Sequence, residues 1–222
     1  MKAVLSLASA SPRRRELLSL GAWMFHVLPV NIDETPAPGE PPLEYVMRMA
    51  VSKAQAAVGK LHPGGIAIAA DTTVADGTDI LGKPANSQQA AAMLWQLRGR
   101  THQVHTAIAV IREGETEPLT DLCTTDVPMR QYTDEEIFTY IGTGDPFDKA
   151  GGYAIQHPRF RPVTSLDGCY ANVVGLPLCH LTRLLRKFDM PPRADIPAEC
   201  QKFLEYDCPI FASILAGDRQ AP

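Results

Sequence analysis

The residues Ile66-Ala67-Ile68-Ala69-Ala70 form a continuous apolar run that leads directly into Asp71-Thr72-Thr73. An apolar run without polar alternation is typical of a strand that is buried on both faces. We therefore expect a central strand over 66–70, with Asp71 in the loop at its end. A carboxylate at the mouth of a buried strand suits a metal ligand or a base for water, and a simple turn cap is the alternative.

Strands and helices alternate on the N-terminal side of this run. Ser11 fits an N-cap and Pro12 the first helical position. The expected strands cover 3–8 and 25–30, and the expected helices cover 12–20 and 43–58. Apolar residues recur at helical spacing in the second helix and predict its buried face: Leu43, Val46, Met47, Ala50, Ala54, Ala57 and Val58.

Antiparallel signals follow the central run. Asp76-Gly77 is typical of a hairpin turn, and Thr133 with Glu136 forms a capping box. We expect strands over 102–111 and 119–129, a turn between short strands at Asp167-Gly168, and helices over 86–97, 133–141 and from Pro177 onward. The pattern predicts an α/β fold with a mixed sheet.

Composition narrows the class of protein. The chain has 222 residues and a formal net charge of -4, which disfavours stable nucleic-acid binding. No apolar stretch approaches the roughly 20 residues that span a bilayer. The five cysteines are scattered without a C-x-x-C pair, as in reduced intracellular proteins. We predict a soluble cytoplasmic protein without a membrane partner.

The character of the chain changes after Lys187, where prolines break it into short pieces. We interpret 1–188 as one domain and 189–222 as a C-terminal extension, with enough apolar residues to pack on the body or on a partner. Cys200 and Cys208 lack matching histidines, so a zinc site is not expected there. His102 and His105 would face opposite sides of a strand, and we interpret both as structural.

Polar clusters carry the chemistry, since the common phosphate-binding motifs are missing. Ser9-Ala10-Ser11-Pro12-Arg13-Arg14-Arg15 joins hydroxyls, a helix N-terminus and guanidinium groups, which together favour an anion. Lys53, at the edge of the apolar face, and Lys83, in a Gly-Lys-Pro turn, suit phosphate contact as well as a surface position. The acids Asp33-Glu34 suit a metal or a solvated loop. The Gly-rich segment 144–156 permits close approach to a ligand.

Taken together, these clusters resemble the Maf family of nucleoside triphosphate pyrophosphatases. The resemblance rests on segments in a matching order over about 3–187: Leu7 to Arg14, Asp33-Glu34-Thr35, Lys53-Ala54, Ala70-Asp71-Thr72, Gly82-Lys83-Pro84, Gly144-Asp145-Pro146 through Ile155-Gln156, and Val174-Gly175-Leu176-Pro177. It implies an elongated α/β fold, similar to that of inosine triphosphate pyrophosphatases, with a strongly bent mixed sheet, flanking helices and a central cleft.

The same resemblance implies a reaction and a site. A nucleoside triphosphate is cleaved to the monophosphate and pyrophosphate with a divalent cation, Mg²⁺ or Mn²⁺. Asp71 is the implied catalytic residue, and Asp71 with Glu34 would hold the metal. The implied substrate-binding side chains are Ser9, Ser11, Arg13, Arg14, Lys53, Thr72, Lys83, Asp145, Lys149 and Gln156. A homodimer is the assembly typical of the family.

Three positions separate the branches of the family, and here they are Arg13, Thr72 and Gln156. This combination resembles the dTTP/UTP branch, and the expected substrates extend to modified pyrimidine nucleotides. Asp33-Glu34-Thr35-Pro36, in contrast, looks as much like the branch that prefers 7-methyl-GTP. Two alternatives therefore stay open: a pyrophosphatase for 7-methyl-GTP or inosine triphosphate, and a non-enzymatic binder that regulates cell division.

Overall fold

The computed structural model describes residues 4–217, so the expected strand start at Ala3 and the end of the extension lie outside the described residues. The sheet has six strands in the order β2-β1-β3-β5-β6, with β4 paired to β3. Their bounds are β1 Leu5–Leu7, β2 Phe25–Val27, β3 Ile66–Asp76, β4 Asp79–Leu81, β5 Thr101–Arg112 and β6 Leu119–Pro128. Pairing is parallel among β2, β1 and β3 and antiparallel elsewhere, which confirms the mixed sheet.

The helices begin where the sequence signals place them. The Ser11 side chain accepts a hydrogen bond from the Arg14 amide, and Thr133 with Glu136 forms both bonds of the capping box. The α-helices are α1 Pro12–Ser19, α2 Pro42–Val58, α3 Ser87–Leu97, α4 Asp134–Gly142, α5 Tyr170–Val174, α6 Leu178–Arg186, α7 Ile196–Leu204 and α8 Phe211–Ala216. Two 3₁₀ turns, η1 Asp145–Asp148 and η2 Ala150–Gly152, occupy the Gly-rich segment.

The central strand is longer than the apolar run predicts. Its antiparallel ladder with β5 runs from Ile66 opposite Arg112 to Ala75 opposite Gln103. Asp71 therefore lies in the middle of β3, opposite Ala107, and the expectation of a loop position for it was wrong. The backbone of β5 supplies hydrogen-bond partners beyond the apolar run, so the strand continues through polar residues.

Two smaller expectations were also wrong. Leu43 is 45% exposed, whereas Met49 is fully buried, because the buried face of α2 is centred on Ala50, Lys53 and Ala57. In the described chain no strands flank Asp167-Gly168; the Gly168 amide instead donates to the Tyr206 hydroxyl of the C-terminal extension.

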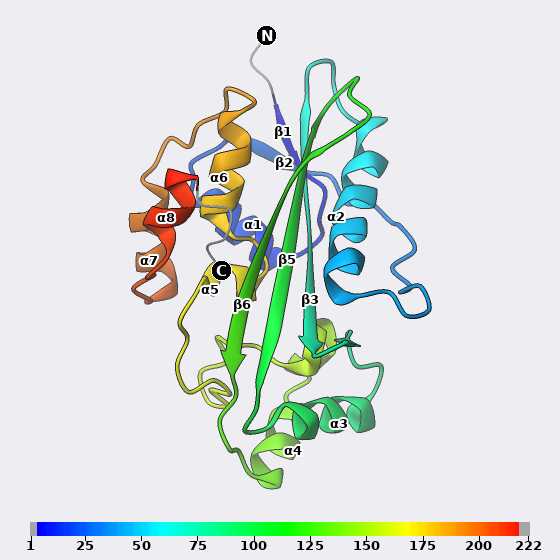
Figure 1. Cartoon of the computed structure of the whole chain (residues 1–222), viewed down its shortest axis with the longest axis vertical. Coiled ribbons are helices and arrows are strands. Elements are labelled where there is room, and N and C mark those ends of the chain that lie inside the picture. Colours follow the sequence, from blue (N-terminus) through cyan, green and yellow to red (C-terminus); the bar gives the residue numbers. More distant parts are fainter. Residues whose placement is uncertain (1–3, 218–222) are drawn as a thin grey trace.

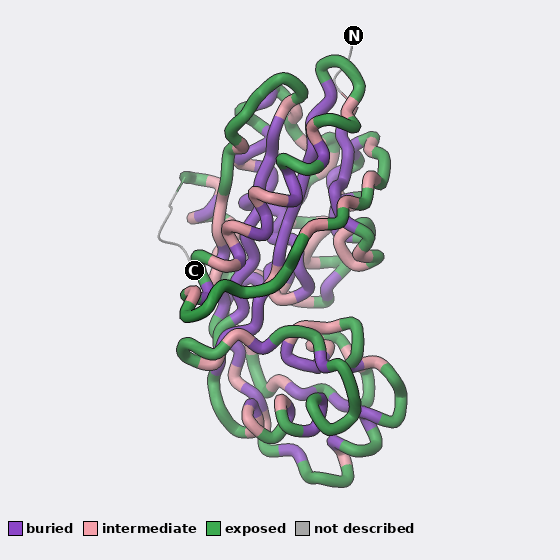
Figure 2. The backbone as a smooth tube through the Cα atoms, turned by 90° about the vertical axis from the view of Figure 1, so that its right-hand side faces the viewer, coloured by how far each residue is buried: buried purple, intermediate pink, exposed green. Residues whose placement is uncertain are grey.

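Small residues let α2 approach the sheet closely. Seven fully buried alanines line this contact: Ala50, Ala54 and Ala57 on α2, with Ala67, Ala69, Ala107 and Ala109 on the strands. The helices α1, α5 and α6 cover the other face of the upper sheet (Figure 1), and their larger side chains belong to a separate core. A second core lies at the bottom of Figure 1, where the end of β3 and the start of β5 pack with α3 and α4; we call it the lower body and the rest of the chain the upper body. The strands thereby connect two bodies of an elongated molecule (Figure 2).

The C-terminal extension packs on the upper body, which is one of the two placements that its apolar content allowed. Its buried side chains Ile196, Leu204 and Ile214 belong to the core of that body. The Trp23 indole donates to the Met190 carbonyl at 3.1 Å, which fixes the start of the extension. The helices α7 and α8 lie beside α6, away from the lower body (Figure 1).

The two strand histidines lie as expected. His102 contacts the Tyr153 hydroxyl at 2.7 Å, and His105 contacts the Thr124 hydroxyl at 2.9 Å. Both are buried, and both rings are held by neighbouring hydroxyls on opposite faces of the sheet. The helices of residues 4–217 are all too short or too polar to cross a membrane.

Candidate active site

A cavity of about 630 Å³ lies between the two bodies, and β3 forms its floor. Its walls come from the end of β1 and the start of α1, from α2, from the β4–α3 turn and from the η segment. Among the described residues that line it are five cations, Arg13, Arg14, Lys53, Lys83 and Lys149, and three acids, Glu34, Asp71 and Asp148. The cavity is thus more positive than negative in a chain with a net charge of -4, which favours an anionic ligand.

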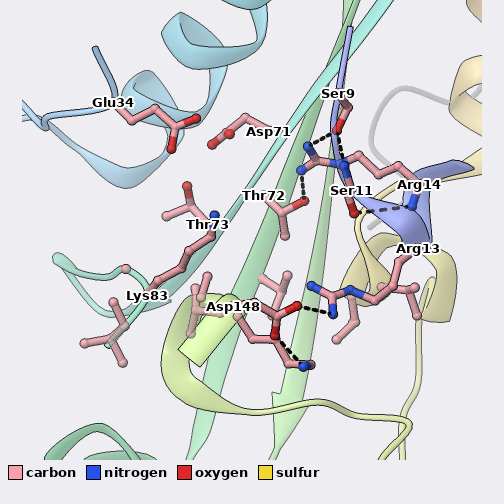
Figure 3. Close-up of a pocket in the computed structure, with 18 of the residues that line it drawn as sticks. Ser9, Ser11, Arg13, Arg14, Glu34, Asp71, Thr72, Thr73, Lys83 and Asp148 are labelled. Atoms are coloured by element: carbon pink, nitrogen blue, oxygen red, sulfur yellow. Dashed lines mark hydrogen bonds and ion pairs between the residues drawn. The ribbon is translucent and has the colours of Figure 1, made fainter. Parts of the chain in front are cut away.

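The hydroxyls of Ser9 and Ser11 line one side of this cavity, on the right in Figure 3. The Ser9 oxygen accepts from the Ser11 amide and from Nη1 of Arg14, each at 3.2 Å. Both lone pairs of Ser9 are then used, so its hydrogen remains to donate. A hydroxyl donor beside a helix N-terminus is suited to a phosphate oxygen.

Arg14 joins three elements from one guanidinium group. Its Nε donates to the Gly175 carbonyl at 2.9 Å, and its Nη2 donates to the Thr72 hydroxyl at 3.0 Å. Burial lowers the pKa of Arg14, and the charge of Asp71 opposes this shift. Three of its five N–H bonds are committed to the protein, so Arg14 organises the wall more than it reaches into the cavity.

Lys53 lies between two carboxylates. Its Nζ is 2.6 Å from Oδ1 of Asp71 and 2.7 Å from Oε1 of Glu34. Lys53 and Asp71 are each 8% exposed, whereas Glu34 reaches in from a loop. Partial burial opposes ionisation of Glu34, but the hydrogen bond and charge of Lys53 outweigh it and lower the Glu34 pKa. Glu34 is therefore held charged, and the two carboxylates converge on the Lys53 ammonium group.

The loop that carries Glu34 is anchored by side chains of α2. The Tyr45 hydroxyl donates to the Glu34 carbonyl at 2.9 Å. Burial raises the pKa of Tyr45 to about 12, with a further rise from Asp71 and Glu34, so the donor stays protonated. Arg48 forms a bidentate pair with Glu40 at 2.6 Å for each bond, which closes the loop on the helix.

The donor set of this site fits a hard divalent cation. Mg²⁺ is commonly held by one or two carboxylates, with substrate phosphates and waters as its other ligands. Asp71 and Glu34 converge from β3 and from the loop, and their common partner Lys53 marks the point between them. No group of three ligating side chains occurs among residues 4–217, so a cation here would also need oxygens of a ligand or water.

The opposite wall is closed by an ion-pair chain. Asp148 lies 3.3 Å from Nη1 of Arg13 and 2.6 Å from Nζ of Lys149. Lys149 also reaches Asp145 at 2.9 Å. Lys83 extends from the β4–α3 turn toward Thr73 across the cavity (Figure 3). The cations Arg13, Lys83 and Lys149 thus face the same space from three different segments.

Of the expected site residues, Asp145 alone does not line the cavity. Its Oδ2 accepts from the Tyr140 hydroxyl at 2.8 Å, and its other oxygen holds Lys149, so it stands behind the wall. Gln156 lines the cavity from an exposed position at the rim. The other expected residues all lie in the lining, which brings together segments from Ser9 to Gln156.

Four residues in or behind the cavity wall were not among the expected site residues. Asp148 lies in the Gly-rich segment directly before Lys149, and this adjacent pair of opposite charges was the available signal. Thr73 is buried in the cavity wall without a hydrogen-bond partner for its hydroxyl. Tyr45 and Thr106 act through Glu34 and Thr72, and no local pattern marks either of them.

These features define an α/β protein with a cation-rich cavity and two carboxylates held by one lysine. The chain belongs to the family described as Maf-like protein, whose model matches residues 4–188. The resemblance stated from the sequence is thereby confirmed.

Curated relatives are similar over most of the chain. A protein of Citrifermentans bemidjiense named dTTP/UTP pyrophosphatase is 44% identical over 180 residues, 81% of this chain and 93% of its own length. A protein of Thermomicrobium roseum with the same name is 44% identical over 210 residues, 93% of each chain. Among solved structures, a HAM1 protein from Coxiella burnetii has a TM-score of 0.40 at 19% identity, over 59% of this chain and 74% of that one.

Proposed function

We propose that this protein hydrolyses nucleoside triphosphates, dTTP and UTP in particular, to the monophosphate and pyrophosphate. The observation that carries the proposal is the Lys53 bridge between Asp71 and Glu34 in a cation-rich cavity. The names of the relatives support the choice of base. Modified pyrimidine nucleotides belong to the same proposal, as substrates of a house-cleaning hydrolase.

The triphosphate would lie along the cationic walls. Ser9 and Ser11 supply hydroxyl donors at the start of α1, where backbone amides also favour negative charge. Arg13 and Lys83 neutralise phosphate oxygens from the facing segments, and Lys149, whose three hydrogens are held by Asp145 and Asp148, adds its charge to the wall. These contacts hold the chain of phosphates so that one phosphorus atom faces Asp71, and positioning of this kind lowers the barrier to phosphoryl transfer.

Asp71 and Glu34 would hold the divalent cation, Mg²⁺ or Mn²⁺. When bound, the cation would neutralise phosphate charge and favour deprotonation of water. Lys53 uses one lone pair of Oδ1 of Asp71, so lone pairs remain on this carboxylate for the cation and for the proton of a water. Lys53 also holds Glu34 charged and near Asp71.

Hydrolysis of the triphosphate forms one bond and breaks one. The oxygen of a water forms a bond to the α-phosphorus, and the bond from that phosphorus to the bridging oxygen breaks. Pyrophosphate leaves with the electron pair of that bond. One proton of the water passes to a lone pair of Asp71 that its other partners do not use, so Asp71 acts as a general base, and the second proton stays on the monophosphate. The cations of the facing wall stabilise the charge that develops on the leaving pyrophosphate.

The cytoplasm is the proposed location, where nucleoside triphosphates are present and cysteines stay reduced. All five cysteines of the chain are free thiols in the structure, which is in keeping with that location. A homodimer without a stable nucleic-acid partner is the proposed assembly, and sedimentation of the purified chain tests it.

The test is pyrophosphate release from a panel of nucleoside triphosphates with Mg²⁺ or Mn²⁺. We expect metal-dependent release from dTTP and UTP, and its loss in Asp71→Asn. Asp76→Asn is the matched control, because Asp76 lies on the same strand but outside the cavity lining. If no nucleotide yields pyrophosphate, the proposal is wrong. If only 7-methyl-GTP or inosine triphosphate yields pyrophosphate, the choice of base is wrong.

A further inference from the structure

The hydroxyl of Thr106 has a fixed direction. Thr106 lies on β5 opposite Thr72 of β3 and is fully buried. Its Oγ1 lies 2.9 Å from the backbone carbonyl of Asn172, in the last turn of the short helix α5. A carbonyl can only accept, so the single hydrogen of Thr106 points to Asn172. Turning it away would leave a buried helix-end carbonyl without a donor.

The direction of the Thr72 hydroxyl follows from that of Thr106. The two oxygens are 3.0 Å apart, and Thr106 has no hydrogen left to donate. Thr72 therefore donates to Thr106, while it accepts from Nη2 of Arg14 at 3.0 Å. Its hydrogen and one lone pair are used, and a single lone pair remains. Thr72 lines the cavity, so it offers a ligand an acceptor and no donor.

Side-chain hydrogen bonds of Asn172 hold the helix α5 against β5 and β6. The side-chain amide of Asn172 donates to the Val104 carbonyl and to the Thr125 hydroxyl, each at 2.9 Å. Asn172 is fully buried, so its backbone carbonyl is fixed against β5. The chain of hydrogen bonds from Asn172 through Thr106 to Thr72 is therefore rigid and has one polarity.

Ser9 and Thr72 differ in the polarity that they present to a ligand, although one guanidinium group, that of Arg14, binds both hydroxyls. Ser9 has both lone pairs occupied and presents a hydrogen, as a phosphate oxygen requires. Thr72 presents only a lone pair, and an ionised phosphate oxygen cannot donate to it. A phosphate oxygen can therefore accept from Ser9 but cannot hydrogen-bond to Thr72, and a ligand group that bonds to Thr72 must carry an N–H or O–H group.

We propose that Thr106 is a positioning residue that makes Thr72 an obligatory acceptor, and that this acceptor selects bases with a hydrogen on the pyrimidine ring nitrogen N3. The inference rests on the proposed function and names the base edge that the same site reads. Uracil and thymine carry N3–H, whereas cytosine has a bare acceptor at N3. Two acceptors that face each other leave a buried polar group unpaired, which is the strongest basis for rejecting a ligand.

The wild-type chain gives the first test. UTP is compared with 3-methyl-UTP, which lacks the N3 hydrogen but keeps both carbonyls, and with CTP. We expect kcat/KM to be at least about tenfold lower for 3-methyl-UTP and for CTP, the effect of one lost hydrogen bond to a fixed partner. Hydrolysis of UTP with equal hydrolysis of 3-methyl-UTP would overturn the inference and leave the proposed function intact. Absence of UTP hydrolysis would overturn the proposed function itself.

Thr106→Val gives the second test. Valine keeps the shape but releases the hydrogen of Thr72, which can then donate into the cavity. We expect the ratio of kcat/KM for UTP over CTP to fall about tenfold, through KM, with kcat for UTP within about twofold. Thr106→Ser keeps the hydroxyl and is expected to keep the ratio. An unchanged ratio in a folded Thr106→Val chain would overturn the inference; if that variant does not fold, the comparison with 3-methyl-UTP decides alone.

Discussion

The Nζ atom of Lys53 lies 2.6 Å from Oδ1 of Asp71, and both side chains are 8% exposed. Lys53 comes from a helix face made otherwise of apolar residues, and Asp71 from the middle of a buried strand. Neither charge is stable at such a position without the other or a ligand. The pair therefore couples the packing of α2 on the sheet to the chemistry of the cavity.

Removal of the lysine tests this coupling. Lys53→Met leaves Asp71 and Glu34 close together without a cation, and we expect a loss of about 3 kcal/mol in the free energy of unfolding. Urea denaturation at neutral pH measures it. Lys60→Met is the control, because Lys60 is exposed just beyond α2, and we expect a change within about 0.5 kcal/mol. Equal stability of the two variants would contradict the coupling.

We expect buried histidines to make the fold less stable in acid, and burial also lowers the pKa of a third, His105. Burial lowers the pKa of His102 and of His180 to about 4, against 6.5 for an exposed histidine. Between these values the unfolded chain binds protons that the folded chain does not, so stability is full above pH 6.5 and falls toward pH 4. The slope is about 1.4 kcal/mol per pH unit for each histidine.

Urea midpoints from pH 7.5 to pH 4.5 measure this slope. In His180→Gln we expect a shallower decline than in the wild type, because one group no longer titrates differently in the two states. His26 is exposed on β2, and His26→Gln serves as the control with an unchanged slope. A wild-type midpoint that stays constant over this range would show that the histidines do not act in this way.

The C-terminal extension shields a cluster of thiols. Cys169, Cys179, Cys200 and Cys208 line one small cavity between α5, α6 and the extension. Burial raises the pKa of Cys200 to about 12 and raises that of Cys179 as well, so few thiolates form at pH 8.

We expect slow reaction of these thiols with a disulfide reagent in the folded chain, and fast reaction in urea. Leu204→Ala removes a buried contact of α7, and we expect it to speed the labelling of Cys179 and Cys200 at least severalfold. Phe203→Ala is the matched control, since Phe203 is 42% exposed on the same helix. Rapid labelling of both thiols in the native wild type would contradict the shielding.

Lys149 and Asp145 have separable roles in the proposed site. Lys149→Met removes a cation from the cavity wall, and we expect KM for UTP to rise about tenfold with little change in kcat. Asp145 stands behind the wall, so Asp145→Asn is expected to raise KM only about twofold to threefold through a less fixed Lys149. Steady-state kinetics on UTP measure both. A larger effect of Asp145→Asn than of Lys149→Met would reverse this assignment.

The sequence by itself determined most of the elements and the chemical groups of the site. Ser11, Pro12 and the Thr133–Glu136 pair fix helix starts through hydrogen bonds of a few residues' range, so local reading located them correctly. The apolar run 66–70 fixed the central strand in the same way. Residues from Ser9 to Gln156 stood out as polar clusters whose types suit a phosphate and a cation.

The tertiary structure alone decided how those groups act. Asp71 lies within a strand because β5 pairs beyond the apolar run, and Asp145 stands behind the wall because Tyr140 holds it there. Thr106 and Asn172 carry no signal of their own, since their effect on Thr72 arises from hydrogen bonds between β3, β5 and α5. The direction of a shared hydrogen depends on every acceptor around it, and only the folded chain brings those acceptors together.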